Sequence, residues 1–278
     1  LMQYLRPYMR QLTLVITLLV VGAGLSLVGP LLIGRAIDAI SKTHSTQTVA
    51  SIAGLMIWAG VGTWLAGSGQ AWIMAGVSQR AVRDMRKDLF EHLQTLSMSY
   101  FDRHSQGDLM SRLTNDMDAV SQSLSQDLTS LISNLLSVLG MIVMMLVLSR
   151  WLALTAFVML PLMFFLTGRV MVWTRPLFLK QQRTVGDLNG VMDEEVGGQR
   201  VVQAFGQQAK ALMVFDASNN AAREAGRRAQ FIAMIMMPLL QFLDHVDVAI
   251  VAGVGGVLVL KGIVTVGLVA TFLTYTQR

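Results

Sequence analysis

The sequence predicts an all-α protein that crosses a membrane several times, and three observations support this prediction. Hydrophobic residues make up 53% of the chain and charged residues only 14%, whereas soluble domains carry about 25% charged residues. The mean hydropathy is +0.54, and the charges fall in blocks between long uncharged intervals. The ten-residue alternation of a membrane β-barrel is absent from the sequence, so the spans are expected to be helices.

The uncharged intervals give the spans in order. They enclose 24 residues after Arg10, 37 after Lys42, 22 after Asp127 and 18 after Arg150. A helix needs about 20 apolar residues to cross the hydrocarbon core. We therefore expect spans at residues 11–34, 50–77, 128–148, 152–171, 231–260 and 264–278, the sixth being cut short by the end of the sequence.

The distribution of Lys and Arg predicts the orientation of the spans. Seventeen of these residues lie in the N-terminal segment and in or beside the two long loops, residues 78–127 and 172–230, with Arg169 counted at the edge of the second loop. Four lie in the short loops. Cytosolic loops carry the excess of basic residues. We therefore expect a multi-pass protein of a bacterial inner membrane or a plasma membrane, with its N-terminus in the cytosol.

The long loops are predicted to be helical continuations of the spans. No Pro or Gly interrupts residues 78–98, and Val82, Leu89 and Leu93 form one apolar stripe. A helix over residues 49–97 would be about 73 Å long, more than twice the thickness of the hydrocarbon core. Residues 109–148, 152–187 and 199–260 show the same character, so we expect long helical extensions in the cytosol.

The chain contains no recognisable catalytic centre. It has no cysteine and no G-x-x-x-x-G-K-[ST] phosphate loop, and its four histidines have no second ligand at metal-binding spacing. Gly253, Gly255 and Gly256 lie within an apolar span, where close helix packing explains them better than a nucleotide-binding turn. We therefore expect no metal or cofactor in this chain. The net charge of +5 lies in loop blocks beside apolar spans, so no nucleic-acid partner is expected.

A first candidate docking element lies in the first long loop. Tyr100 and Phe101 are adjacent aromatic residues in a polar turn, and aromatic residues are enriched in the cores of protein interfaces. The alternative is that the two rings only cover the end of a helix hairpin. The candidate residues are Ser99, Tyr100, Phe101, Asp102, Arg103 and His104.

A second candidate lies in the second long loop, between Gly190 and the pair Gly197 and Gly198. The glycines are expected to bracket one short acidic helix that lies across the long helices. The alternative is a solvated turn. The candidate residues are Asn189, Met192, Asp193, Glu194 and Glu195.

Polar side chains within the fifth span form a candidate substrate pathway. A carboxylate inside a membrane is costly unless it faces a wet cavity or a partner. The flexible thioethers of methionine suit a surface that accepts varied ligands. The candidate residues are Met234, Met237, Gln241, Asp244, His245 and Asp247. The alternatives are a structural polar cluster and a proton-linked role for the histidine between two carboxylates.

Three motifs give the chain a resemblance to a known family. Residues 100–116 read YFDRHSQGDLMSRLTND, residues 194–205 read EEVGGQRVVQAF, and residues 265–275 read TVGLVATFLTY. With the order of the spans, they resemble the transmembrane domain of an ABC exporter of the six-helix multidrug and lipid type. The resemblance implies that the two docking elements are coupling helices that sit in clefts of nucleotide-binding domains, which this chain lacks. ATP and magnesium are expected on those domains.

The function predicted from this resemblance is that of the membrane-spanning half of an ATP-driven exporter. Two halves, identical or related, would move amphiphilic, drug-like or lipid-like substrates, including hydrophobic or cationic molecules, by alternating access. One alternative is a proton-coupled secondary transporter or channel that uses Asp244, His245 and Asp247. The other is a truncated membrane scaffold without transport activity.

Overall fold

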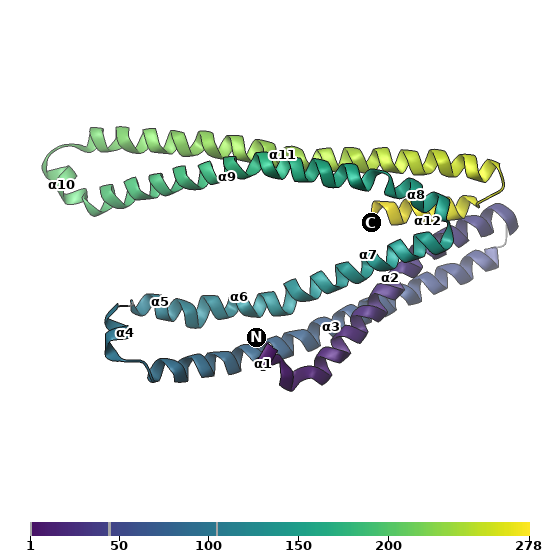
Figure 1. Cartoon of the computed structure of the whole chain (residues 1–278), viewed down its shortest axis with the longest axis horizontal. Coiled ribbons are helices and arrows are strands. Elements are labelled where there is room, and N and C mark those ends of the chain that lie inside the picture. Colours follow the sequence, from purple (N-terminus) through teal and green to yellow (C-terminus); the bar gives the residue numbers. More distant parts are fainter. Residues whose placement is uncertain (1, 44–45, 104) are drawn as a thin grey trace. The chain divides into compact units, whose positions relative to one another are not determined.

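A computed structural model describes residues 2–43, 46–103 and 105–278 of the chain. In these ranges the chain forms helices and turns without a strand, which confirms the all-α prediction (Figure 1). Five helical segments within them are long and apolar enough to cross a membrane. They are Gln3–Ser41, Thr46–Gln94, Leu109–Leu148, Arg150–Gly197 and Gln208–Leu260.

The chain divides into two compact units. Residues 1–153, 254–276 and 278 form the first unit, and residues 154–253 and 277 form the second. Three helices therefore contribute residues to both units, namely α8 (Arg150–Phe157), α11 (Gln208–Leu260) and, through Gln277 alone, α12 (Val266–Gln277).

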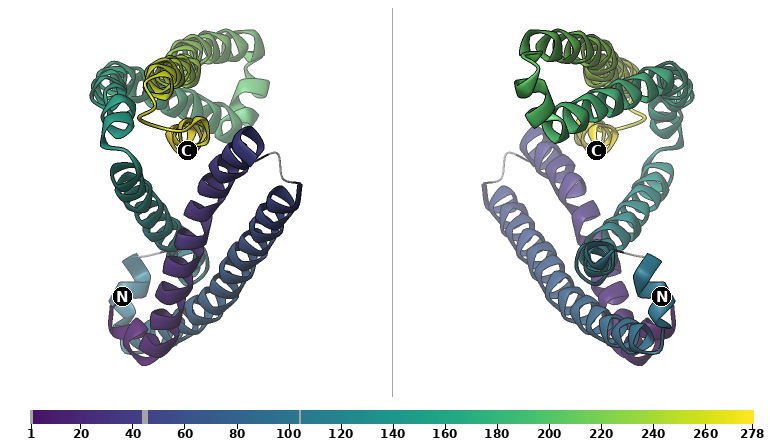
Figure 2. Two further views of the ribbon diagram at one scale, coloured as in Figure 1. Left: turned by 90° about the vertical axis from the view of Figure 1, so that its right-hand side faces the viewer. Right: turned by 90° about the vertical axis from the view of Figure 1, so that its left-hand side faces the viewer.

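The first unit begins with a short hook, residues 2–8, that leads into a long antiparallel hairpin. The hook contains α1 (Met2–Leu5) and the 3-10 turn η1 (Arg6–Tyr8), where Pro7 occupies one of the first positions. The hairpin consists of α2 (Met9–Thr43) and α3 (Thr46–Gln94) (Figure 2). The 49 residues of α3 equal the length expected from the sequence, although the helix begins at Thr46 rather than Val49.

The chain then turns through α4 (Met98–Arg103) and returns along a third limb. This limb consists of α5 (Gln106–Ser111), the π-helical turn η2 (Arg112–Asp116), α6 (Met117–Gln122), a second π-helical turn η3 (Ser123–Asp127) and α7 (Leu128–Leu148). The limb is bonded to α3, because the hydroxyl of Ser78 donates to the carbonyl oxygen of Ser121 at 2.9 Å.

The core of the first unit lies where the hook, α2, α3 and the third limb meet. Small and β-branched residues let the helices approach closely there, as Val77 and Ala81 are fully buried. The core side chains are Leu5, Val15, Leu19, Met74, Val77, Ala81 and Leu124. Because Leu5 belongs to this core, the hook is packed onto the hairpin rather than projecting from it.

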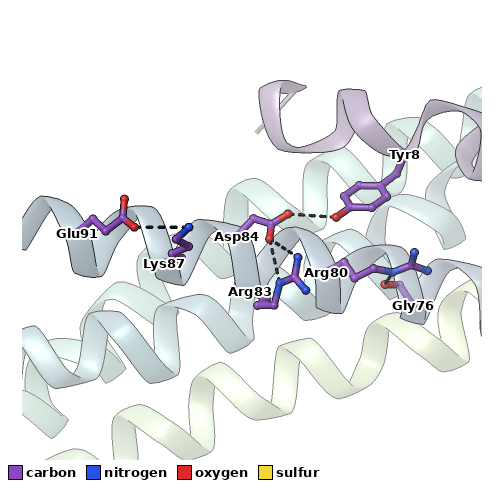
Figure 3. Close-up of polar contacts among 7 residues, drawn as sticks. All are labelled: Tyr8, Gly76, Arg80, Arg83, Asp84, Lys87 and Glu91. Atoms are coloured by element: carbon purple, nitrogen blue, oxygen red, sulfur yellow. Dashed lines mark hydrogen bonds and ion pairs between the residues drawn. The ribbon is translucent and has the colours of Figure 1, made fainter.

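Two tyrosines also fasten the hook to α3. The hydroxyl of Tyr4 donates a hydrogen bond to Asp88 at 2.8 Å, and the hydroxyl of Tyr8 donates one to Asp84 at 3.1 Å. The two tyrosines are four residues apart in the hook, and the two aspartates are four residues apart on α3. The hydrogen bonds therefore attach the hook to two consecutive turns of α3. Figure 3 shows Tyr8 above α3 beside Asp84 and Arg80, whose guanidinium carbon lies 5.4 Å from the centre of the tyrosine ring.

The first unit is completed by α12 (Val266–Gln277), which follows a turn at Gly262 with φ +70°. This helix packs on α2, since the hydroxyl of Tyr275 donates to the carbonyl oxygen of Leu27 at 2.6 Å. With 12 residues it occupies most of the expected sixth span, residues 264–278, and it is too short to cross a bilayer alone.

The second unit is a long antiparallel hairpin of α9 (Met159–Gly197) and α11 (Gln208–Leu260), preceded by α8 (Arg150–Phe157). The helix bends at Val158 between α8 and α9. Pro161 explains the bend, because it offers no N–H to the carbonyl group of Phe157 four residues earlier. The hairpin sides are close at Gly226, where an added Cβ would lie 3.7 Å from the side-chain amide of Gln181.

Candidate functional site

The first candidate docking element is α4, at the far end of the α3 limb. Two backbone hydrogen bonds, Thr95 N to His92 O at 3.0 Å and Tyr100 N to Ser97 O at 2.9 Å, end α3 and start α4. The rings of Tyr100 and Phe101 meet edge to face, with centroids 5.9 Å apart. The two aromatic rings are therefore in contact in the edge-to-face arrangement that aromatic pairs prefer.

The outer surface of α4 is exposed and partly apolar. Met98 is 77% exposed and Phe101 39% exposed, while Ser99, Asp102 and Arg103 are exposed polar residues beside them. His104, which we also predicted to belong to this element, lies outside the described residues. The element thus exposes aromatic, methionine and polar side chains together, and aromatic residues and methionine are enriched at protein interfaces.

The prediction of a separate acidic helix at the second element is wrong. Asn189, Met192, Asp193, Glu194 and Glu195 all lie in the last turns of α9, which continues to Gly197. An added Cβ at Gly190 or Gly197 would meet no atom within 4 Å, so neither glycine is required by packing. A glycine inside a helix costs only about 1 kcal/mol, which is too little to end a helix of this length.

The short helix of the second element is instead α10 (Gln199–Ala204), and the continuous helix expected over residues 199–260 is interrupted after it. The chain turns at Gly198, where a Cβ would lie 2.9 Å from the carbonyl oxygen of Glu194, and again at Gly206, which has φ +65°. Figure 2 shows α10, in green, between the ends of α9 and α11.

A cavity of about 460 Å³ lies between the end of α9, α10 and the start of α11. Its lining is mostly apolar, with Glu195 as the carboxylate at its margin. Two of the predicted residues, Met192 and Glu195, line it, and Asn189, Asp193 and Glu194 do not. The lining residues are Met192, Glu195, Val196, Gln199, Val202, Gln208, Ala211, Leu212 and Phe215.

Sequence reasoning did not select two strongly exposed apolar residues of this element. Val201 is 61% exposed and Phe205 74% exposed, on and directly after α10. The pair Gly197 and Gly198 and the isolated Gly206 mark the two ends of α10 in the sequence. These glycines identify the short helix better than the run of acidic residues does.

The six predicted pathway residues all lie on α11, but they have different environments. Met234, Met237, Gln241 and His245 are exposed, and Asp244 is half-buried. Asp247 is only 5% exposed, and its Oδ1 atom has no hydrogen-bond partner among the described residues. Asp247 therefore differs from the rest of the set as a buried carboxylate with unused hydrogen-bonding capacity.

The charged part of α11 lies before the expected span. Glu224 accepts hydrogen bonds from Arg227 at 3.0 Å and from Arg228 at 2.8 Å. These two guanidinium groups lower the pKa of Glu224 to about 2, so the carboxylate is ionised at neutral pH. The described residues contain no group of three or more metal-ligating His, Cys, Asp or Glu side chains.

The comparison with known families decides what this arrangement is. The ABC transporter transmembrane region matches residues 12–277. The chain belongs to this family. It is therefore an all-α polytopic membrane domain of the ABC exporter type, as predicted.

Curated relatives of this ABC transmembrane domain are longer than the chain itself. An uncharacterised ABC transporter ATP-binding protein, YfiC of Bacillus subtilis, is 31% identical over 99% of this chain and 46% of its own length. A fatty acid ABC transporter ATP-binding/permease protein of Mycobacterium tuberculosis is 30% identical over 88% of this chain and 38% of its own length. An ATP-dependent lipid A-core flippase of Syntrophus aciditrophicus is 28% identical over 74% of this chain and 34% of its own length. The chain thus spans less than half the length of these relatives.

Proposed function

We propose that this membrane half of an ABC exporter moves amphiphilic, lipid-like substrates by alternating access, driven by ATP and magnesium on nucleotide-binding domains. The chain has no phosphate-loop motif of its own, so both ligands are assigned to those domains. A second copy or a related half completes the transporter. The names of the fatty acid transporter and the lipid A-core flippase support the choice of acyl-chain substrates.

The observation that carries the proposal is the pair of short helices that connect long helices. Of these, α4 follows α3, and α10 connects α9 to α11. Phe101 on α4 and Phe205 directly after α10 are exposed apolar side chains. They lie at the ends of helices that are about 60–80 Å long. A stiff helix transmits a displacement along its whole length. In the proposal, α4 and α10 bind the nucleotide-binding domains, and the long helices carry the motion of those domains to the membrane.

The coupling test uses the full-length transporter with its nucleotide-binding domains. We expect Phe101→Ala and Phe205→Ala each to lower substrate-stimulated ATP hydrolysis at least about tenfold, since a central aromatic anchor often contributes 2 kcal/mol or more to an interface. The matched controls are Phe90→Ala on α3 and Phe178→Ala on α9, which truncate exposed phenylalanines outside α4 and α10. Equal stimulation in all four variants would exclude coupling through α4 and α10.

The proposed pathway is tested separately at Asp247. Asp247→Asn keeps the shape of the side chain and removes its charge, so transport of a cationic amphiphile is expected to fall while basal ATP hydrolysis is retained. Asp244→Asn is the neighbouring variant, and Asp216→Asn, at an exposed position of α11 before the span, is the control. Unchanged transport in the Asp244 and Asp247 variants would remove these residues from the pathway.

A further inference from the structure

A small polar notch lies between three helices of the first unit, α2, α3 and α7. Its volume is about 180 Å³. Its polar side chains are Ser26, Thr63, Gln70, Ser133 and Ser137, and its other lining residues are small or aliphatic. No ionisable residue is among the described residues that line it, so the notch is polar and uncharged.

Small residues keep the notch open. An added Cβ at Gly22 on α2 would lie 3.6 Å from the Cβ of Ala66 on α3, which is ordinary contact between two closely packed helices. An added Cβ at Gly67, one residue further along α3, would meet nothing within 4 Å. The helices therefore touch on one side of the notch and leave open space on the other.

The polar groups of the notch have hydrogen-bonding capacity left over. Ser26 donates to the carbonyl oxygen of Ala23 at 2.7 Å, and Thr63 donates to that of Ala59 at 2.9 Å. Both hydroxyl hydrogens are thus used within their own helices, and the oxygens remain as acceptors. Gln70 is only 8% exposed and lines the notch, and its carboxamide makes no hydrogen bond to any described residue.

The depth of the notch makes this unused capacity significant. Gly22, Thr63 and Ser137 lie near the middle of the spans expected at residues 11–34, 50–77 and 128–148. Water is scarce at this depth, and a polar group without a partner is costly there. Polar residues inside a membrane are usually functional for the same reason.

We propose that the polar notch binds a neutral hydroxyl or amide group of a membrane-soluble amphiphile. Such a group donates to the oxygens of Ser26 and Thr63 and accepts from the amide of Gln70. A charged group is disfavoured, because no opposite charge lines the notch. The notch is smaller than the roughly 300–1,000 Å³ of sites that enclose a whole drug-sized ligand. It therefore holds the polar group alone, and the acyl chain lies outside it.

This inference deepens the proposed export of amphiphiles by naming the chemistry that one subsite recognises. It is tested by binding in the absence of nucleotide, so that its outcome is independent of coupling to ATP. The probe is tritiated 1-oleoylglycerol, which carries two hydroxyl groups on one acyl chain. The full-length protein is placed in phosphatidylcholine nanodiscs, since phosphatidylcholine offers no hydroxyl donor that would compete.

We expect saturable binding of the probe that excess methyl oleate, which has the acyl chain without hydroxyl groups, does not displace. Gln70→Leu removes the amide, and Gly67→Leu fills the open space. Each is expected to weaken binding roughly fivefold or more, Gln70→Leu by the loss of one hydrogen bond and Gly67→Leu because its side chain occupies the space of the ligand. Gly60→Leu is the control, because a Cβ at this exposed position of α3 also meets nothing within 4 Å and the residue lies outside the notch.

Three outcomes would overturn the inference. The first is the absence of saturable binding of the probe. The second is equal binding of the probe by the Gln70, Gly67 and Gly60 variants. The third is displacement of the probe by methyl oleate to the same extent as by unlabelled 1-oleoylglycerol. Gln70→Leu keeps the test decisive if Gly67→Leu fails to fold. If binding follows the expected pattern but the coupling test at Phe101 and Phe205 fails, coupling through α4 and α10 is excluded and the notch stands. If the coupling test succeeds and the binding test fails, only the proposed ligand binding in the notch is rejected.

Discussion

The carboxylate of Asp38, on α2, accepts a hydrogen bond from the hydroxyl of Thr265 at 2.6 Å, although 227 residues separate them in the sequence. The second oxygen of Asp38 accepts from the backbone N–H of Gly267 at 2.9 Å. Thr265 is itself the N-cap of α12, and its side chain accepts from the backbone N–H of Leu268. Two side chains from distant segments therefore cap one helix, and α12 is fixed to α2 by its first turn.

The first prediction concerns this shared cap. In Asp38→Asn one of the two acceptor oxygens becomes an N–H₂ group, so one hydrogen bond is lost at a cost of about 1 kcal/mol. Hydrogen exchange at the amides of Gly267 and Leu268 should then become roughly fivefold faster. Asp127→Asn is the control, because Asp127 precedes α7 without making a side-chain cap hydrogen bond. Unchanged exchange in the Asp38 variant would show that Thr265 suffices alone.

The second prediction concerns the glycine contact between α2 and α12. A Cβ at Gly34 would overlap the backbone oxygen of Gly267, and a Cβ at Gly267 would overlap that of Gly34. Gly34→Ala and Gly267→Ala should therefore each destabilise the protein by about 1–3 kcal/mol, seen as a lower thermal midpoint in detergent. Gly24→Ala and Gly29→Ala introduce the same Cβ into open space on α2 and should leave the midpoint unchanged or higher. Equal midpoints for all four variants would contradict the close approach.

The third prediction concerns the N-terminal hook. Tyr8→Phe keeps the aromatic ring and removes the hydroxyl that donates to Asp84. Since the chain has no cysteine, Gln3→Cys provides a single site for a nitroxide label. The label should become more mobile in the Tyr8 variant. Tyr275→Phe, which loses the hydrogen bond to Leu27 far from the hook, should leave the label unchanged. A Tyr8 variant with unaltered label mobility would mean that the Tyr4–Asp88 hydrogen bond and the packing of Leu5 hold the hook without the hydroxyl of Tyr8.

The fourth prediction concerns the pH dependence of this contact. A hydrogen bond from Arg83 lowers the pKa of Asp84 below its ordinary value of 3.8, and the hydrogen bond from Tyr8 acts in the same direction. A carboxylate whose pKa is lower in the folded protein stabilises the fold above its ordinary pKa, and this contribution is lost as the pH falls through the lowered value. The label at residue 3 should keep one mobility between neutral pH and about pH 4, then gain mobility at lower pH. In Asp84→Asn the contribution of residue 84 to this transition should vanish, and a transition identical to that of the parent protein would assign it to another group.

Much of the helical architecture could be predicted from the sequence because it depends on local properties. Long uncharged intervals and the rarity of helix-breaking residues predict long helices, and α3 has the 49 residues expected for its segment. The place of α4 was predicted for the same reason, since Tyr100 and Phe101 directly follow the amphipathic segment that forms the end of α3. The motifs of both docking elements and of the last helix carried the family resemblance.

The short helix of the second docking element, α10, could not be placed correctly from the same kind of reasoning. Gly190, Gly197 and Gly198 look alike in the sequence, and only the last has the backbone oxygen of Glu194 within 2.9 Å of an added Cβ. The acidic residues before it continue α9, and the short helix lies beyond them, in α10. Gly198 ends α9 in a backbone conformation where a Cβ would crowd the carbonyl oxygen of Glu194. Composition does not reveal which of the three glycines adopts this conformation.

The sequence by itself determined that this protein is an all-α membrane domain of long helices, because run length, charge spacing and helix propensity act along the chain. Only the tertiary structure decided that Asp38 caps α12, that Gly34 and Gly267 touch, that Asp247 is the buried member of its set, and that Gln70 faces a polar notch. These relationships join residues that are distant in sequence. They depend on which helix faces pack together, and packing is a property of the folded chain.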